Sequence, residues 1–199
     1  MGQPAYQSPP DETPAYVSAE DYLRFEREAA NKHEYYFGEV QAMAGAMPSH
    51  NILCSRLHGL LFSQLDARGC TSYTSDQRVQ VMSGKSYVYP DYSALCGEAK
   101  YNDDKAPDNL LNPTLIVEVL SESTRTKDRG EKFMLYRQLP SLRQYLMLDS
   151  TAVHAELYTR QPNDYWLFME TRDLNAVLDL SSVGCELLLT RLYQGIDLG

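Results

Sequence analysis

The sequence has no run of about 18 consecutive apolar residues, which is the length that a membrane-spanning helix requires. Its first residues also lack the basic start and apolar core of a secretion signal. These absences predict a cytoplasmic protein with no membrane partner. Four prolines fall before residue 15, and they predict a flexible tail over residues 1–15.

Cysteine is scarce, and the four cysteines lie far apart in the sequence. They form no C-x-x-C pair and no Cys/His cluster, which argues against a structural zinc site. We expect them to be reduced thiols, as is usual in cytoplasmic proteins. The four are Cys54, Cys70, Cys96 and Cys185.

Positive charge is also in short supply, with 18 Lys and Arg against 27 Asp and Glu and a net charge of −9. Because phosphate binding depends on Lys and Arg, strong non-specific binding to DNA is not expected. The basic residues are concentrated, however. Segment 125–143 carries six of them against two acidic residues, a local balance of +4, which allows one basic face.

The length of 199 residues, 43% of them hydrophobic, suits one domain, which we place at residues 16–199. Apolar spacing predicts helices that begin at Ser18 and Ser49, a third over 126–138 and a short one at 190–194. Segment 97–113 is polar and predicts a loop. Strands are predicted near 34–43, 71–81, 86–95, 114–120, 143–149, 153–159, 165–170 and 185–188. This order predicts an α/β fold with a central mixed β-sheet flanked by helices.

Two acidic residues are associated with segments that read as buried strands. Asp91 follows Pro90 after the apolar segment 87–89, and Glu118 lies in the middle of Leu115–Leu120. A buried carboxylate must be neutralised by a partner or a metal ion. Two of them on neighbouring strands would offer the oxygen ligands that Mg²⁺ prefers. The pattern therefore favours metal-assisted hydrolysis, most simply of phosphodiesters.

The helix predicted after Glu118 carries a second pattern. Asp128, Lys132 and Tyr136 are spaced four residues apart and therefore share one face. Lys132 would offer a point charge to a phosphate, and Tyr136 would orient it. The alternative is a structural ion pair between Lys132 and Glu118, or a solvated helix face. Two roles remain open for His50, which is either a capping or packing residue or a functional one.

Three motifs follow one another in the sequence: Pro90-Asp91, Glu118-Val-Leu-Ser and the helix motif Asp-x-x-x-Lys-x-x-x-Tyr. This ordered set resembles the PD-(D/E)XK nuclease superfamily. More narrowly, the sequence resembles a bacterial, cyanobacteria-rich family of small restriction-endonuclease-like proteins. Segment 34–39, Glu-Tyr-Tyr-Phe-Gly-Glu, matches the Glu-x-x-x-Gly-Glu strand of that family, and segment 140–149 matches its strand after the helix. The resemblance extends from about residue 18 to residue 193. It implies a restriction-endonuclease-like fold.

The resemblance also implies roles for individual residues. Asp91 and Glu118 would be metal ligands for Mg²⁺ or Mn²⁺, with the Val119 carbonyl as a third. The superfamily has a lysine where this sequence has Leu120, and Lys132 would replace it from the helix. The remaining implied site residues are Glu34, an auxiliary acid, and Tyr136.

Three functions remain open at this point. The first is a metal-dependent DNA endonuclease, acting as a homodimer because two sites cut two strands most simply. The second is a catalytically silent protein of nuclease fold that binds nucleic acid or oligomerises, which the acidic charge and Leu120 favour. The third is a hydrolase of a small phosphorylated molecule.

Overall fold

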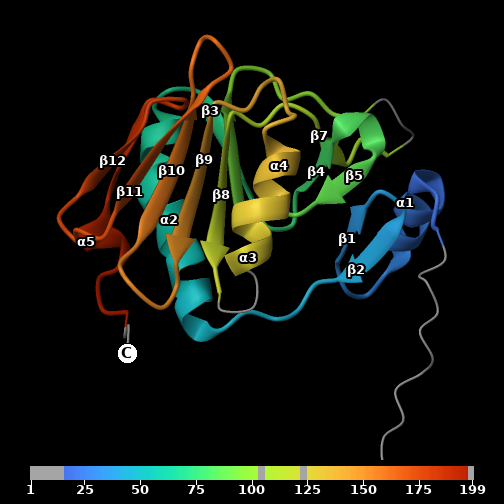
Figure 1. Ribbon diagram of the computed structural model, residues 1–199, viewed down its shortest axis with the longest axis horizontal. Coiled ribbons are helices and arrows are strands. Elements are labelled where there is room, and N and C mark those ends of the chain that lie inside the picture. The colour runs from blue at the N-terminus through green and yellow to red at the C-terminus, as the bar shows by residue number, and fades with distance from the viewer. Residues whose placement is uncertain (1–15, 103–105, 122–124, 197–199) are drawn as a thin grey trace, which may run out of the picture.

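The computed structural model describes residues 16–102, 106–121 and 125–196, and the predicted tail over 1–15 lies outside them (Figure 1). Its helical segments are α1 (Ala19–Glu28), α2 (Pro48–Asp66), a 3₁₀ turn (Met82–Gly84), α3 (Arg125–Lys127), a π-helical turn (Asp128–Lys132), α4 (Phe133–Tyr136) and α5 (Leu189–Leu192). The strands are β1 (His33–Tyr36), β2 (Glu39–Ala42), β3 (Cys70–Thr74), β4 (Arg78–Val81), β5 (Ser86–Val88), β6 (Tyr92–Cys96), β7 (Asn109–Leu110), β8 (Leu115–Leu120), β9 (Gln144–Asp149), β10 (Ala155–Arg160), β11 (Trp166–Thr171), β12 (Val177–Leu180) and β13 (Cys185–Leu188).

These strands form three sheets. The largest has the order β11-β10-β9-β8-β6-β3, the second has the order β2-β1-β5-β4-β7, and β12 pairs with β13. The six-stranded sheet is mixed, because β8 runs parallel to β9 and antiparallel to β6. The predicted mixed α/β architecture flanked by helices is therefore confirmed, with its strands divided among three sheets.

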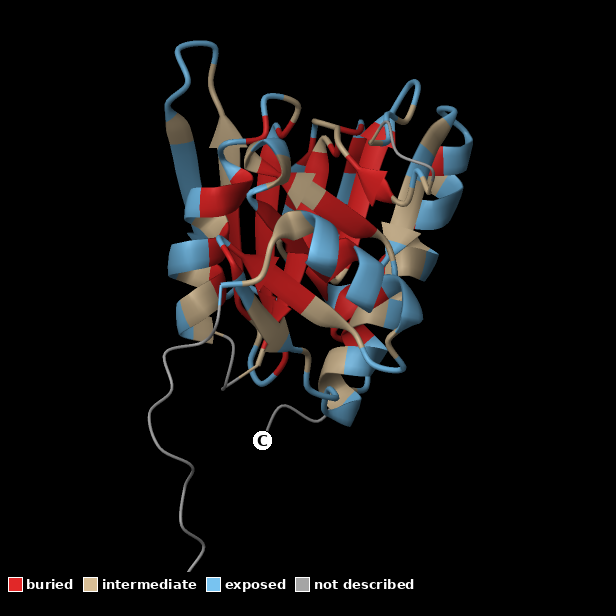
Figure 2. Ribbon diagram, turned by 90° about the vertical axis from the view of Figure 1, so that its right-hand side faces the viewer, coloured by how far each residue is buried: buried red, intermediate tan, exposed pale blue. Residues whose placement is uncertain are grey.

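Helices cover both faces of the six-stranded sheet (Figure 1). On one face, α2 buries Leu53, Leu57, Leu61 and Leu65 in a cluster with residues of β8. On the other face, α4 packs its buried residues against the opposite side of the same strand. Because side chains alternate along a strand, β8 is buried on both faces. The central strands accordingly form the buried interior, while the helices keep an exposed side and the edge strand β11 is largely exposed (Figure 2).

The predicted strand over 86–95 is wrong as a single element. It divides into β5 and β6 at Pro90, whose missing N–H cannot join a ladder of hydrogen bonds. β5 belongs to the five-stranded sheet and β6 to the six-stranded sheet. Asp91 therefore lies where the chain crosses from one sheet to the other.

Other boundaries also differ from the prediction. Segment 71–81 forms two strands separated by a turn, β7 lies within the predicted loop, and β12 was not predicted. Helix α2 begins at Pro48 rather than Ser49, with Met47 at the cap position. Proline is favoured at the first position of a helix because its backbone needs no hydrogen-bond acceptor there. Ser18 does cap α1, where its hydroxyl accepts a hydrogen bond from Asp21 N.

Two of the cysteines expected to be reduced form a disulfide. Cys70 on β3 and Cys96 on β6 face each other across the antiparallel pair and are bonded. The sequence spacing of 26 residues did not reveal this, because the register of the two strands brings them together. Cys54 and Cys185 are free thiols.

This pairing predicts the number of thiols in the protein. Protein purified without reductant and then denatured should react with Ellman's reagent at two thiols per chain, those of Cys54 and Cys185. The Cys70→Ser variant should show three, because Cys96 loses its partner. Four reactive thiols in the wild type would instead support the reduced state predicted from the sequence.

Within the described part of the chain, no helix combines the length and the apolar character needed to cross a lipid bilayer.

Candidate active site

Glu118 is the centre of the site. It is the one acidic residue of β8 and is 2% exposed, on the side of the strand that faces α4. Its Oε1 accepts hydrogen bonds from Tyr136 Oη at 2.7 Å and from Lys132 Nζ at 3.1 Å. Burial raises the pKa of the Glu118 carboxyl well above its ordinary value; Lys132 opposes this rise, while Asp91 and Asp128 add to it. The unliganded site thus resists a full negative charge on Glu118.

Asp91 lies beside Glu118, as predicted, but from the crossing between β5 and β6 rather than from a strand. Its backbone N–H donates to Glu118 Oε2 at 3.4 Å, and its Oδ2 accepts from Val119 N at 2.8 Å. His50 Nε2 lies 3.2 Å from the same oxygen. Burial disfavours the ionised carboxylate, but the hydrogen bonds and charge of His50, with the Val119 N–H, hold the pKa of Asp91 below its ordinary value.

Lys132 points to the carboxylates rather than to solvent. Its Nζ lies 3.1 Å from Glu118 Oε1, 3.3 Å from Glu34 Oε1 and 3.4 Å from Asp128 Oδ1. Burial lowers the pKa of this amine, but the three carboxylates outweigh burial and raise it well above its ordinary value. Lys132 is therefore a fixed positive charge at this point of the site.

Backbone geometry contributes to this placement. Asp128–Lys132 forms a π-helical turn between α3 and α4 rather than continuous α-helix. Such turns are uncommon and occur often at functional sites. The four-residue spacing still brings Lys132 and Tyr136 to one face, since both contact Glu118 Oε1. The predicted shared face of this helix is thus present.

Glu34 enters the site from the five-stranded sheet. Its Oε2 accepts from Tyr36 Oη at 2.6 Å, and its Oε1 accepts from Tyr89 N at 3.2 Å. Lys127 Nζ approaches Oε2 at 3.4 Å. Burial opposes ionisation of Glu34, but Lys132, Tyr36 and Lys127 lower its pKa below the ordinary value. The auxiliary acid implied by the resemblance therefore lies within the same cluster.

The five predicted site residues thus occupy one region at the junction of the two large sheets. A cleft of about 810 Å³ opens there, between segment 41–47, the start of α2 and the π-helical turn. Tyr136 lies fully buried behind Glu118 and holds it by a hydrogen bond. The residues from the predicted set that line the cleft are Glu34, Asp91, Glu118, Val119 and Lys132.

The structure adds residues that sequence reasoning left out of the set. His50 comes from the first turn of α2, and Asp128 Oδ1 is buried in an ion pair with Lys132 that does not have hydrogen-bond geometry. Lys127 donates to Gln41 Oε1 at 2.7 Å as well as approaching Glu34. Asp128 was visible in the four-residue spacing. For His50 the sequence leaves a functional role open, and no local pattern links it to Asp91, 41 residues away.

The charges of the cluster do not balance. With all of its carboxylates ionised, the cluster has four negative groups against two ammonium groups and the imidazole of His50, which pairs with Asp91. A divalent cation would offset the excess of negative charge, and the carboxylate oxygens are suitable donors for one. These groups are Glu34, Asp91, Glu118 and Asp128 against Lys127 and Lys132. The residues present therefore fit a divalent metal ion.

The mixed sheet flanked by helices, with Glu118 on β8, Asp91 just before β6 and a lysine from the helical segment after β8, makes this a restriction-endonuclease-like α/β protein. Residues 19–190 match the model of the Uma2 family, described as "Putative restriction endonuclease", and the chain belongs to that family.

Relatives agree with this assignment. The protein is 35% identical over 180 residues to uncharacterized protein slr1290 of Synechocystis sp. strain PCC 6803, covering 90% of this chain and 93% of that protein. It is 34% identical over 169 residues to uncharacterized protein sll1609 of the same organism, covering 85% and 95%.

A solved structure is also similar. The crystal structure of "a putative nuclease belonging to DUF820" from Anabaena variabilis ATCC 29413 superimposes with a TM-score of 0.65. The match covers 89% of this chain and 97% of that one, at 15% sequence identity. At this identity the likeness concerns the fold, and it agrees with the fold class predicted from the sequence.

Proposed function

We propose that this protein is a metal-dependent endonuclease that hydrolyses DNA phosphodiester bonds. The observation that carries the proposal is the position of Lys132, whose ammonium lies within 3.4 Å of three carboxylates at the cleft. A lysine from the helix thereby takes the place that Leu120 cannot fill. Membership of the Uma2 family supports the same reaction class.

Asp91 and Glu118 would hold the ion, Mg²⁺ or Mn²⁺, together with the carbonyl of Val119. When bound, such an ion polarises the phosphoryl oxygen and lowers the pKa of a coordinated water. Val119 already fixes Asp91, because its N–H donates to Oδ2. Tyr136 fixes Glu118 in the same way. Both carboxylates are therefore oriented before any ligand arrives.

The other site residues act on the phosphate. Lys132 faces the cleft and stabilises the negative charge that develops on the phosphoryl oxygens during hydrolysis. Glu34 pairs with both Lys132 and Lys127, one through each of its two oxygens. No side chain needs to act as a covalent nucleophile in this scheme. The protein positions the ion and the phosphate, and it supplies the positive charge of Lys132.

Cleavage of supercoiled plasmid and of single-stranded DNA tests the proposal. The wild type is compared with Asp91→Asn and Glu118→Gln in Mg²⁺, Mn²⁺ or EDTA. Nicking that requires the ion and is lost in both variants supports the endonuclease. If folded, ion-loaded wild type cleaves no DNA, the proposal is wrong.

A second candidate is hydrolysis of a small phosphorylated molecule. Four of the six basic residues in segment 125–143 are engaged in ion pairs with acidic residues, so they do not present a free basic face. The pairs are Arg125–Asp149, Lys127–Glu34, Arg129–Glu156 and Lys132–Glu118. The cleft volume of about 810 Å³ also lies in the range of small-ligand pockets. Hydrolysis of the small diester bis(p-nitrophenyl) phosphate by a protein that has no affinity for DNA would favour this candidate.

We also propose that the protein is a homodimer. Strand β11 is the outer strand of the six-stranded sheet, and Leu167 (61% exposed), Phe168 (46%) and Met169 (37%) lie along it. An apolar edge strand is a natural site for pairing with a second chain. Antiparallel pairing of two β11 strands would join the sheets of two copies.

This arrangement predicts the effect of one charge on assembly. If two β11 strands pair about Phe168, the Phe168→Lys variant places two lysines opposite each other and should weaken the dimer by about fivefold, or roughly 1 kcal/mol. Light scattering across a dilution series measures the dissociation constant. Lys85→Glu, at an exposed turn position far from β11, is the control. A wild type that is monomeric at all concentrations contradicts the proposal.

A cytoplasmic location is part of the same proposal, because chromosomal and incoming DNA lie there. The disulfide between Cys70 and Cys96 would then have to persist in a reducing compartment. Alkylation of free thiols at the moment of lysis shows whether the bond exists in cells. A disulfide found in cells, together with DNA cleavage activity, would be consistent with both the bond and a cytoplasmic location.

A further inference from the structure

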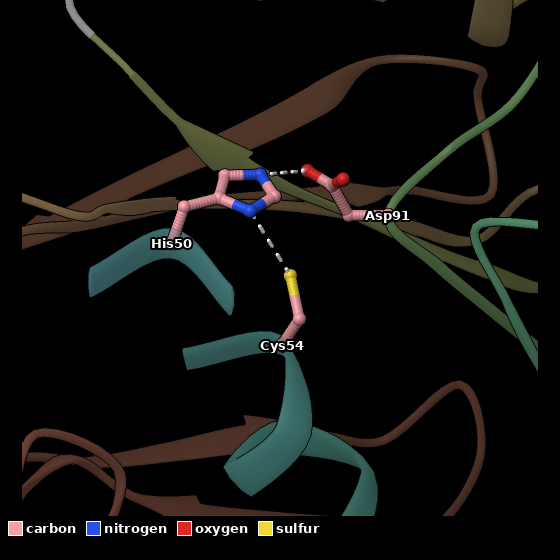
Figure 3. Close-up of side chains that lie close together, drawn as sticks. All are labelled: His50, Cys54 and Asp91. Carbon is pink, nitrogen blue, oxygen red and sulfur yellow. Dashed lines mark hydrogen bonds and ion pairs between the residues drawn. The ribbon is translucent and has the colours of Figure 1, made fainter. Parts of the chain in front are cut away.

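His50 and Cys54 lie one turn apart on α2, and both project toward Asp91 (Figure 3). His50 Nε2 is 3.2 Å from Asp91 Oδ2, and Cys54 Sγ is 3.6 Å from His50 Nδ1. The potential ligand atoms of the three residues lie within 4.8 Å of one another. This is a nitrogen donor and a sulfur atom beside a carboxylate already assigned to the metal.

The separation of His50 Nε2 from Asp91 Oδ2 is compatible with a shared ion. Two ligand atoms that each lie about 2.1 Å from one ion, at an angle of about 90–110°, are roughly 3.0–3.4 Å apart. The observed 3.2 Å falls within that interval. The imidazole therefore needs little movement to become a ligand next to Asp91.

The other ring nitrogen of His50 is also accounted for. A histidine that binds a metal through one nitrogen usually makes a hydrogen bond through the other, and this bond fixes the ring. Here Nδ1 faces the sulfur of Cys54, and the side chain of His50 is 14% exposed. Cys54 thus orients the ring so that Nε2 faces Asp91.

We propose that His50 Nε2 is a nitrogen ligand of the ion held by Asp91 and Glu118, and that it makes the site prefer a transition ion such as Mn²⁺ over Mg²⁺. The inference rests on the metal centre of the proposed function. Mg²⁺ binds oxygen donors almost exclusively, whereas imidazole is a good donor to transition ions. Cys54 is a positioning residue that holds the imidazole through Nδ1.

Spectroscopy of bound Mn²⁺ tests the ligand directly, without DNA and without any variant. Electron spin echo modulation of the wild type loaded with Mn²⁺ should show the ¹⁴N coupling of a coordinated imidazole. Binding by titration calorimetry should show Mn²⁺ tighter than Mg²⁺. In His50→Gln the ¹⁴N coupling should disappear and Mn²⁺ affinity should fall by about 10–100-fold, with Mg²⁺ affinity little changed.

His58→Gln is the matched control. His58 lies on the same helix, its ring centroid is 4.6 Å from that of Tyr92, and it does not line the cleft. Its variant should keep both the coupling and the preference for Mn²⁺. Absorption of bound Co²⁺ tests Cys54, since an intense thiolate charge-transfer band would overturn its assignment as a positioning residue.

The outcomes separate this inference from the proposed function. Mn²⁺ that binds through Asp91 and Glu118 without ¹⁴N coupling, and with selectivity unchanged in His50→Gln, overturns the inference alone. A wild type that binds no divalent ion overturns the metal centre and the inference with it. Ion binding by the wild type tells the two cases apart, and loss of that binding in Asp91→Asn shows that the ion uses this site.

Discussion

Lys132→Gln is expected to lower the rate of metal-dependent DNA cleavage by on the order of 10²–10³-fold. The amide of glutamine retains a hydrogen-bond donor for Glu118 but removes the positive charge that faces the cleft. If Lys132 stabilises the charge that develops on the phosphate, the loss should fall mainly on kcat. Rates of plasmid nicking at saturating Mn²⁺ and DNA measure it.

Lys85→Gln is the control for this variant, because Lys85 is an exposed lysine in the turn before β5 and outside the cleft. It should cleave at the wild-type rate. Circular dichroism of both variants checks that the fold is retained. Unchanged cleavage by folded Lys132→Gln would show that the lysine is only a structural partner of Glu118.

Much of this site could be predicted from the sequence because its residues are marked locally. Glu118 interrupts a run of buried apolar residues, and a charge in such a run needs a partner. Lys132 and Tyr136 follow at the spacing of one helical face. These signals were enough to expect Lys132 at Glu118. Tyr136 was expected to orient Lys132, and it instead donates a hydrogen bond to Glu118 Oε1.

Other parts depend on tertiary packing that no local pattern records. His50 meets Asp91 only because α2 packs across the six-stranded sheet beside the crossing at Pro90. Cys70 meets Cys96 only because β3 and β6 pair in one particular register. The apolar segment 86–95 reads as one strand, and the division between two sheets depends on which partners each half finds.

The basic segment 125–143 shows that charge counted along the sequence also misses tertiary partners. Counted along the sequence, residues 125–143 have a local excess of positive charge. In the structure, Arg125 pairs with Asp149 and Arg129 pairs with Glu156, from strands further along the chain. A count within a segment cannot see these partners, so it overestimates the positive charge available to a nucleic acid.

The imbalance of charge at the cleft leads to the second large effect. Glu118→Gln should abolish cleavage and at the same time stabilise the ion-free protein, by on the order of 1–2 kcal/mol. Removing one of the four carboxylates reduces the excess of negative charge, while Glu34 and Asp128 still neutralise Lys132. Lys132→Gln should have the opposite effect on stability, because it increases the excess.

The pH dependence of this stabilisation has a definite sign. Burial, with Asp91 and Asp128, raises the pKa of Glu118 in the folded protein above the value of 4.5 that it has when unfolded. The folded state therefore binds this proton more tightly. The contribution of this proton to the free energy of unfolding is fully present below about pH 4.5. It is lost as the pH rises through the pKa that Glu118 has in the folded protein. Glutamine cannot lose a proton. The stability of Glu118→Gln relative to the wild type should therefore increase as the pH rises.

Thermal unfolding in EDTA at about pH 5 and about pH 8 measures this difference. A gain of 1 kcal/mol corresponds to roughly 2–4 °C for a protein of this size. The exposed Glu98→Gln is the control and should unfold like the wild type at both values. Divalent ions should stabilise the wild type and not Glu118→Gln. A variant less stable than the wild type at the higher pH would mean that Lys132 already neutralises Glu118, and the site would then need no ion to balance its charge.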